Sequence, residues 1–570
     1  MNKFNYDNYL KLYNIYSKKV NIVSIIRLIV FMLMVFSFFI SSSYKTFFYS
    51  GIFLFIVFII LIFIHDSLYK KLDYYKKYLS ILDEYKDRID GSWKNFIDNG
   101  KEFNTDLFND LNIVGDNSLF QYISICKTIG ARKKLIKRLS NNKYNRKMLE
   151  DSYNTVKELR DNIIFDIDFQ VKIYDFRGKN INLSDGFKCF DNKESNRNID
   201  LVIGMLFSFI CLLLLVLGYF KIISINYFYG MFIFNFLINY MYSYIYINEF
   251  NNITNVSSLY GGLKDVYNSI LSNSFKSSNM IKIFNNISNS YDVIKKIGFI
   301  DNLNNLKNNI LSSFIFNGLF SVNIITMYLY SNYQINEVDK LKSGINSIED
   351  LEMFISLASV GIVNDDVCIP NINDNVSISF KDMKHPLISN CIGNDFNCKA
   401  GVNIITGSNM GGKTTFIRSV GINIVLMNAG TFVCASEFNS SYFNIFSSII
   451  VNDDISRGIS TFYGELLRIK EAIKYNSGNR LVLIDEIFKG TNYNDRIYGA
   501  KSVINKLNDN KTIVFVTTHD FELCDVKNIN NYYFREYYEG NSINFDYKIR
   551  EGKCVSTNAK YLMKNIGIID

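Results

Sequence analysis

Proline and histidine are nearly absent from this chain. Its 570 residues include two prolines and three histidines, His65, His385 and His519. Because proline interrupts helices, so few prolines leave long helices open almost everywhere. Three histidines exclude a histidine-rich metal site and argue against a structural zinc site. The nine cysteines are scattered without a CxxC pair, which is typical of a reducing compartment.

A strong excess of charge is also missing. The formal net charge of +8 is modest for this length, and many lysines flank apolar blocks, so the charge does not by itself indicate nucleic-acid binding. Aromatic residues make up 15% of the chain and hydrophobic residues 48%, which argues against disorder over most of the length. The chain is long enough for several domains and a large core.

Four long apolar runs occur as two pairs. Residues 22–42 and 47–64 form the first pair, and residues 201–220 and 225–247 form the second. Each run is close to the roughly 20 residues that a helix needs to cross about 30 Å of hydrocarbon. The alternative, a buried core helix, suits runs of about a dozen residues better. The sequence therefore predicts two transmembrane hairpins.

Positive charge flanks the first pair of runs and predicts its orientation. The lysines concerned are Lys18, Lys19, Lys70, Lys71, Lys76 and Lys77. The positive-inside rule then places the N-terminus, residues 67–198 and everything after 248 in the cytoplasm. We expect a multi-pass protein of the inner (cytoplasmic) membrane, of bacterial origin, with a retained N-terminus because its polar start does not fit a cleavable signal.

A fifth apolar stretch, residues 314–331, is interrupted by Asn317, Ser321, Asn323 and Thr326. A fifth span would place the C-terminal part of the chain outside the cell. We therefore expect this stretch to form a long buried helix.

A phosphate-loop pattern lies at residues 407–415, GSNMGGKTT, after a β-rich run and before a helical stretch. Gly407, Gly411 and Gly412 allow backbone amides to surround phosphate oxygens, Lys413 supplies a cation, and the Thr414 hydroxyl can ligate Mg²⁺. The remaining loop positions are predicted nucleotide contacts: Ser408, Asn409, Met410 and Thr415.

Two further strand ends complete this pattern. The apolar run in RLVLIDEIFKGT, residues 480–491, predicts a buried strand followed by Asp485, beside Mg²⁺, and Glu486, placed to polarise the attacking water. TIVFVTTHDFEL predicts another strand, ending at His519, which could sense the γ-phosphate. With Glu486, His519 and Lys413 as catalytic residues, the sequence predicts an ATPase that cleaves ATP to ADP and phosphate with Mg²⁺.

The order of TGSNMGGKTT, DDISRGISTFYGEL, LVLIDEIFKGTNYND and TTHDFEL resembles the ATPase domain of the MutS mismatch-repair family over about residues 375–570. The resemblance implies that Ser460 reaches the γ-phosphate of the opposite subunit, and that Asn409 contacts phosphate. It also implies that Asp495 lies on the loop communicating between sites, and that Phe396 stacks on adenine. Glu465 matches a family glutamate after STF. Composite sites of this kind imply a homodimer.

Residues 118–142 are similar to the start of the MutS core domain, and later helical patterns resemble its lever helices. Three departures stand out. No mismatch-reading domain with a Phe-x-Glu motif precedes the core, the second hairpin lies where the family has its DNA clamp, and the sequence ends at GIID without a helix-turn-helix. Arg496 also replaces a glycine common in the family. We therefore expect no mismatch recognition by this chain itself.

The predicted fold class is a C-terminal α/β P-loop NTPase domain (MutS/ABC-like) after an all-α lever and core region with two transmembrane hairpins. Its predicted parts are residues 1–66, with the first hairpin; 67–198, a cytosolic helical region; 199–247, the second hairpin; 248–365, the lever; and 366–570, the ATPase domain.

The leading interpretation is a membrane-anchored ATPase whose dimer closes on ATP and moves its lever helices, acting on an unknown protein partner. One alternative is a membrane-tethered DNA-binding or DNA-repair protein, with the basic stretch 131–147 (Lys133, Lys134, Lys137, Arg138) facing phosphates; that stretch equally suits a solvated helix face or anionic lipid. A third, an ABC-type transporter, lacks its LSGGQ-like signature.

Overall fold

The structure is a computed structural model of the chain. It describes residues 5–41, 44–140, 146–176, 197–306, 310–408, 410–450, 461–539 and 542–553. The chain divides into two compact units. The first comprises Met1–Trp93 with Ile163–Asp175, and the second comprises Lys94–Asn162 with Phe176–Asp570.

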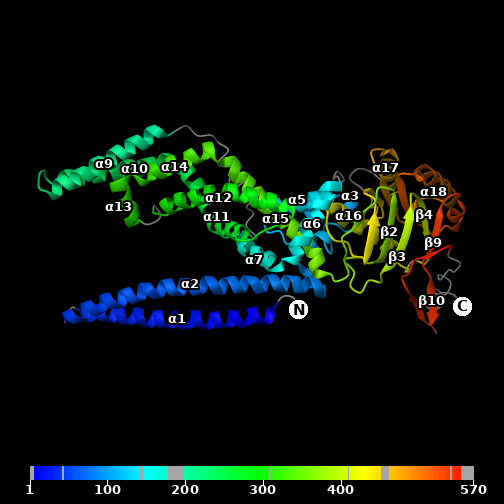
Figure 1. The fold of residues 1–570 in the computed structure, drawn as a ribbon, viewed down its shortest axis with the longest axis horizontal. Helices are drawn as coiled ribbons and strands as arrows, with labels where there is room; N and C mark the ends of the chain where they lie inside the picture. Colours follow the sequence, from blue (N-terminus) through cyan, green and yellow to red (C-terminus); the bar gives the residue numbers. More distant parts are fainter. Residues whose placement is uncertain are drawn as a thin grey trace. The chain divides into compact units, whose positions relative to one another are not determined.

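The first unit is built on a helical hairpin of α1 (Tyr6–Ile40) and α2 (Lys45–Asp90), which lie side by side (Figure 1). Aromatic rings join them, with Tyr9 stacked on Tyr78 at 3.9 Å between ring centroids. The 46 residues of α2 make it roughly 69 Å long, more than twice the hydrocarbon thickness. The predicted boundary at residues 66 and 67 is therefore wrong, because no break occurs there and the helix ends only at Gly91.

The C-terminal half of α2 is covered by α7 (Ile163–Ile173). Tyr74 Oη donates to Asp168 Oδ1 at 3.0 Å, and Gln170 Nε2 donates to Tyr85 Oη at 2.9 Å. The predicted region 67–198 is thus not one structural part, because its segment around α7 belongs with the first hairpin.

The second unit begins with a helical region. Its α-helices are α3 (Asp106–Asp110), α4 (Leu119–Ile123), α5 (Ile129–Ser140), α6 (Arg146–Asp161), α9 (Asn198–Tyr219), α10 (Asn226–Ile245), α11 (Ile247–Leu271), α12 (Ser278–Asn305), α13 (Ile310–Phe320), α14 (Val322–Asn336) and α15 (Val338–Val363). The long helix α15 packs against α5, α6 and α12, and α11 packs against α12. Leu351, Ile355 and Leu357 of α15 are fully buried at this junction, as expected of the central helix of a bundle.

Among the described residues, three helices are long and apolar enough to cross a membrane, namely α1, α2 and α9. The predicted fourth span, residues 225–247, forms α10, but its asparagines and tyrosines leave it outside that group. The stretch 314–331 is not the single buried helix that we predicted. It forms α13 and α14, which meet at 77° and which together could make a fourth apolar element.

The C-terminal part contains a six-stranded sheet in the order β12-β9-β4-β8-β7-β6. Its strands are β4 (Gly401–Thr406), β6 (Asn444–Ser448), β7 (Arg480–Ile484), β8 (Thr512–Thr517), β9 (Asn530–Tyr533) and β12 (Arg550–Glu551). All neighbours are parallel except β12 and β9. The central strands β4, β7 and β8 are buried along their whole length, which explains their continuous apolar sequences.

Helices cover both faces of this sheet. On one face, α17 (Thr461–Lys474) and α18 (Tyr493–Leu507) pack against alternate strand residues such as Val482 and Val514. On the other face, α16 (Lys413–Ala429) packs on β7 and β8. This three-layer arrangement agrees with the predicted α/β class of the C-terminal domain.

A second sheet has the order β1-β5-β2-β3, and β10 pairs with β11 as a separate hairpin. The strands are β1 (Asn371–Ile372), β2 (Ser377–Met383), β3 (Asn394–Lys399), β5 (Glu437–Ser440), β10 (Glu536–Glu539) and β11 (Ser542–Phe545). Phenylalanine rings from β2, β3, β5, β8 and α16 form an aromatic cluster that joins the second sheet to the first: Phe380, Phe396, Phe416, Phe438 and Phe515.

Candidate functional site

The carboxyl ends of three neighbouring parallel strands bring the predicted site residues to one edge of the sheet. Ile405 of β4 is in register with Thr517 of β8, and Ile484 of β7 is in register with Val516. The phosphate loop, the acidic pair and His519 each begin within two residues of these strand ends. Open parallel sheets place ligands at this edge.

The phosphate loop wraps around the ammonium group of Lys413. The Lys413 Nζ atom donates to the carbonyl oxygens of Gly407 and Ser408 at 2.7 and 2.9 Å. Gly407 has φ +136°, and a Cβ there would lie 2.5 Å from the Phe534 carbonyl oxygen, so the position requires glycine. Asn409, a predicted phosphate contact, lies outside the described residues.

Two features of this loop suit an anionic ligand. Lys413 is the first residue of the 17-residue helix α16, so the free amides and the positive dipole end of that helix point at the loop. The Ser408 hydroxyl is buried, and among the described residues it has no hydrogen-bond partner. A phosphate oxygen would supply the acceptor that this hydroxyl lacks. Met410, by contrast, is exposed.

The predicted Mg²⁺ ligands lie together. Thr414 Oγ1 donates to Asp485 Oδ1 and Oδ2 at 2.9 and 2.8 Å, and Thr517 Oγ1 holds Asp485 from the other side at 2.5 Å. A hydroxyl and a carboxylate beside a phosphate loop are the oxygen ligands that Mg²⁺ accepts when the nucleotide and water provide the rest. Both residues therefore fit a Mg²⁺–nucleotide complex.

Glu486 stands at a strained turn directly after β7. Its backbone has φ +52°, which is uncommon for a residue other than glycine and is often found at functional sites. The turn is fixed by its amide, which donates to Thr517 O at 3.1 Å, and by Glu465 of α17, whose Oε1 accepts the Phe488 amide at 2.8 Å. Burial raises the pKa of Glu465 to about 7.

Charges around Glu486 keep it ionised. Burial favours its protonated form, but the hydrogen bond and charge of Lys489 (Nζ to Oε2, 2.5 Å), together with Lys413, outweigh burial and lower the pKa of Glu486. His519 Nε2 lies 3.5 Å from Glu486 Oε1 and 3.4 Å from Lys413 Nζ. Burial and the charge of Lys413 lower the pKa of His519, so its imidazole is neutral at pH 7.

Asp495 has local contacts at the start of α18. Its amide donates to the Asn492 side chain at 3.0 Å, and its carboxylate accepts from Asn492 Nδ2 at 2.5 Å. The next residue, Arg496, forms a two-pronged ion pair with Asp520 at 2.8 and 3.0 Å, directly after His519. The structure thus makes Asn492 the N-cap of α18, with Asp495 as its partner in the first turn, and it assigns the contact with the His519 loop to Arg496.

The prediction that Phe396 stacks on adenine is wrong. Its ring is buried within the aromatic cluster, with neighbouring ring centroids at 4.8 Å (Tyr532), 5.4 Å (Phe515), 5.5 Å (Phe416) and 5.8 Å (Phe380). Strand alternation explains the error, because inward positions of β3 alternate with exposed ones. A base cannot reach a ring face that protein already covers.

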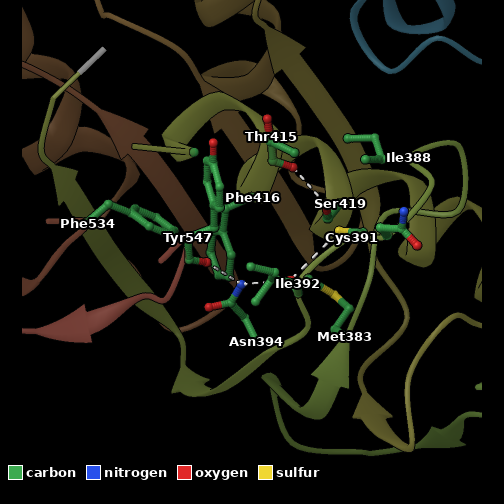
Figure 2. A pocket seen from close by; sticks show the side chains of 12 residues that line it. Met383, Ile388, Cys391, Ile392, Asn394, Thr415, Phe416, Ser419, Phe534 and Tyr547 are labelled. Carbon is green, nitrogen blue, oxygen red and sulfur yellow. Dashed lines mark hydrogen bonds between the residues drawn. The ribbon is translucent and has the colours of Figure 1, made fainter. Parts of the chain in front are cut away.

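An apolar pocket beside the phosphate loop is a better place for a base (Figure 2). Its cavity of about 320 Å³ falls in the range of small-molecule pockets. Gly412 and Thr415 form the wall next to the loop, and Ile388, Ile392 and Tyr547 contribute apolar surface. Asn394 Nδ2 donates to the Tyr547 carbonyl at 3.0 Å, which secures that part of the wall. The apolar residues Ile388 and Ile392 in the loop between β2 and β3 were the sequence signal for this pocket.

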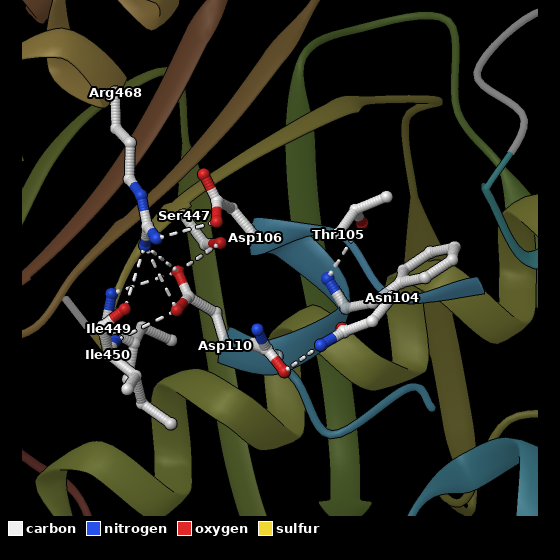
Figure 3. A network of polar contacts seen from close by, with 10 residues as sticks. Asn104, Thr105, Asp106, Asp110, Ser447, Ile449, Ile450 and Arg468 are labelled. Carbon is white, nitrogen blue, oxygen red and sulfur yellow. Dashed lines mark hydrogen bonds and ion pairs between the residues drawn. The ribbon is translucent and has the colours of Figure 1, made fainter. Parts of the chain in front are cut away.

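A polar network that includes none of the site residues predicted from the sequence connects α3 to the segment beyond β6 (Figure 3). Asp110 is fully buried. It accepts hydrogen bonds from Ser447 Oγ at 2.7 Å, from the amides of Ile449 and Ile450 at 3.1 and 2.9 Å, and from Arg468 Nη1 at 3.2 Å. It thereby holds both the end of β6 and α17, on either side of residues 451–460. Ser460, the predicted trans serine, lies outside the described residues.

The sheet with helices on both faces, the phosphate loop and the acidic residues at the strand ends define a domain of the P-loop class. A family model described as MutS domain V matches residues 403–566. The resemblance to the MutS family is thereby confirmed, and it rests on the C-terminal part of the chain.

Three relatives named "DNA mismatch repair protein MutS" illustrate the extent of this similarity. The protein from Clostridioides difficile is 32% identical over 227 residues, which cover 37% of this chain and 24% of the relative. The protein from Clostridium perfringens is 32% identical over 252 residues (41% and 28%), and that from Clostridium botulinum 34% over 206 residues (34% and 22%). The chain thus spans about a quarter of the length of the curated relatives it matches.

Proposed function

We propose that this chain is a membrane-anchored MutS-type ATPase that binds ATP and Mg²⁺ at the edge formed by β4, β7 and β8. The observation that carries the proposal is the gathering of Lys413, the Thr414–Asp485 pair, Glu486 and His519 at that edge. The apolar pocket of Ile388, Ile392 and Tyr547 would take the base.

The charge of each side chain decides its role in the proposed reaction. Lys413 and the amides at the start of α16 bind the phosphate oxygens, and Thr414 with Asp485 would hold Mg²⁺. Bound Mg²⁺–ATP supplies the phosphoanhydride bond that is cleaved. Glu486, ionised at neutral pH, orients a water molecule and accepts its proton. Neutral His519 donates or accepts a hydrogen bond at Nε2 between Glu486 and Lys413.

Hydrolysis by the purified full-length protein in detergent tests the assignment. Glu486→Gln should lower turnover by about 10²–10⁴-fold while nucleotide binding persists, because a general base contributes on that order. Lys413→Ala should weaken binding itself. Glu471→Gln and Lys506→Ala change the same residue types on exposed positions of α17 and α18 and should leave both properties unchanged. Normal turnover in Glu486→Gln would show that the base is misassigned.

Membrane anchoring is the second part of the proposal. The apolar stretches of α1, α2 and α9 are strongly hydrophobic, and few of their residues are fully buried within the protein. Such surfaces are stable against acyl chains and costly in water. The protein should remain in the membrane pellet after washing with alkaline carbonate and should be released by detergent. Recovery in the soluble fraction without detergent would refute anchoring.

A homodimer closing on ATP, with lever helices that pass the motion to the membrane or to a protein partner, completes the proposal. We place the nucleotide site in the cytoplasm. Crosslinking of the Glu486→Gln protein in native membranes with ATP should trap the closed dimer and its partner. If crosslinking at saturating ATP yields only the monomer, the dimer is refuted.

DNA is the second candidate partner, because the relatives carry mismatch repair in their names. The predicted basic stretch supports it weakly, since several of its charges are used internally: Arg132 with Asp98 and Glu102, Lys134 with Asp350, and buried Arg138 with the Ala429 carbonyl. Lys133 and Lys137 stay exposed. If they contact phosphates, neutralising both should lower the salt slope of DNA binding by about two. An unchanged slope would exclude this stretch as the DNA contact.

A further inference from the structure

The break between α13 and α14 lies in a segment without charge. No Asp, Glu, Lys or Arg occurs from residue 310 to residue 336. Neither helix, with 11 and 15 residues, is long enough to cross the hydrocarbon by itself, and the two bend by 77° at Ser321, whose φ is +50°. The eleven residues of α13 make roughly 16 Å of helix, about half of the hydrocarbon thickness.

Side chains from α9 and α10 satisfy the polar groups that this break exposes. Asn235 Nδ2 donates to the Gly318 carbonyl at 3.0 Å, and Asn235 Oδ1 accepts from Ser321 Oγ at 2.9 Å. Ser208 of α9 also reaches Ser321, at 3.0 Å between the hydroxyl oxygens. Asn235 and Ser321 are fully buried. Broken helices are tolerated at membrane depth when protein groups satisfy them in this way.

The opposite face of α13 is apolar and uncovered. Ile315, Phe316 and Phe320 are exposed, each with at least a third of its surface accessible, whereas Phe314 packs on Phe232 and Phe236 of α10. Both α13 and α14 pack on α9 and α10, and α9 carries exposed apolar residues such as Phe209. The apolar face of α13 therefore adjoins the helix that is long and apolar enough to cross a membrane.

The helices on either side of this segment decide whether it crosses. Before it comes α12 and after it comes α15, and these two pack directly on each other, with Asn286 Nδ2 donating to Ser347 Oγ at 3.0 Å. Two helices in contact outside the bilayer must lie on the same side of it. The chain between them has to return to the side from which it started.

We propose that α13 and α14 enter the bilayer as a re-entrant helix pair against α9 and α10, with the apolar face of α13 in contact with acyl chains. This inference rests on the proposed membrane anchoring. It makes the second membrane element a bundle of four helices, in place of the simple hairpin predicted from the sequence, and it leaves the ATPase domain on the side of α12.

Tryptophan fluorescence tests the lipid contact, because the chain has one tryptophan, buried Trp93, as a constant background. The full-length variants Phe316→Trp, Phe209→Trp and Tyr498→Trp place a second tryptophan on α13, on α9 and on exposed α18. Each is reconstituted into phosphatidylcholine vesicles with plain or brominated acyl chains. We expect bromine to quench Phe316→Trp about as strongly as Phe209→Trp, and Tyr498→Trp no more than the wild type.

The outcomes separate the two proposals. If Phe209→Trp is quenched and Phe316→Trp is not, anchoring stands and the re-entrant pair is refuted, whether water or another protein covers α13. If neither is quenched, both fail. Re-entry is tested with Lys282→Cys on α12 and Lys340→Cys on α15, both exposed. An impermeant thiol reagent should label both from the same side of sealed vesicles, above the wild-type background, and labelling from opposite sides would show a full crossing.

Discussion

Asp110 offers the sharpest test of how the helical region is attached to the ATPase domain. Its carboxylate accepts two backbone amides, a hydroxyl and the Arg468 guanidinium, and it is fully buried. In Asp110→Asn one carboxylate oxygen becomes an NH₂ group. This group cannot accept the hydrogen bond of the donor that faces it. The substitution keeps the shape of the side chain and removes one hydrogen-bond acceptor. The loss in the free energy of unfolding therefore measures the polar network and not a cavity.

The size of the expected loss of stability depends on the contacts that Arg468 keeps in Asp110→Asn. Arg468 keeps Asp106, at 3.1 Å, and the Ile450 carbonyl, at 3.0 Å, so its charge is not left bare. Breaking a buried charge pair costs about 3–5 kcal/mol, and the surviving contacts of Arg468 place Asp110→Asn at the lower end, about 3 kcal/mol. Asp106→Asn is the matched control. It contacts the same arginine, but its side chain is 74% accessible, so its loss should stay below about 1 kcal/mol.

Thermal unfolding of the full-length protein in detergent measures the difference. Asp110→Asn should lower Tm by several degrees, and Asp106→Asn should change it by about a degree or less. Turnover should fall with Asp110→Asn, because Asp110 holds the residues on both sides of the segment that carries Ser460. Equal melting temperatures for the two variants would refute the reasoning, since burial would then make no difference to this carboxylate.

Three further outcomes are expected. Burial raises the pKa of Glu352 to about 7, so its contribution to stability is present at low pH and is lost as pH rises through about 7, with a slope of roughly 1.4 kcal/mol per unit. Glu352→Gln should therefore flatten the fall of Tm between pH 5 and 8, and an unchanged profile would contradict the assignment. Mixing Lys413→Ala with Ser460→Ala protein should restore about a quarter of wild-type hydrolysis, because half of randomly mixed dimers are mixed and each has one intact site; no recovery would indicate a serine acting in cis. Arg496→Ala should lower kcat with little change in nucleotide binding, because the ion pair with Asp520 positions the loop that carries His519. A change in nucleotide binding without a change in kcat would contradict this.

The gathering of Lys413, Asp485 and His519 at one edge of the sheet was predictable because its signals are local. Lys413, Asp485 and His519 each follow a short apolar run that can only be a buried strand, and parallel strands bring their ends together. Phe396 was misplaced although the alternation of β3 already points its ring inward. In that case a resemblance was given more weight than the period of the strand.

The errors in the helical region have non-local causes. The bend at Ser321 depends on Asn235, 86 residues earlier in the chain, and no local pattern announces that contact. The full length of α2 was readable in principle, because neither proline nor glycine occurs between Gly51 and Gly91. There the end of the apolar run was mistaken for the end of the helix, although a helix can leave the membrane without a break.

The helix α16 connects the phosphate loop to the helical region at its far end. Its first residue is Lys413, and the carbonyls of its last turn accept hydrogen bonds from the helical region: Ala429 O from Arg138 Nε at 2.9 Å, and Met427 O from Tyr153 Oη at 2.9 Å. A cation at a helix C-terminus is favourable, and both donors are buried. Any displacement of the loop along the axis of α16 must therefore move α5 and α6 or break these bonds. Because α5 and α6 pack on α15, and α15 contacts α14, packed helices continue from the proposed nucleotide site to the segment that we place in the bilayer.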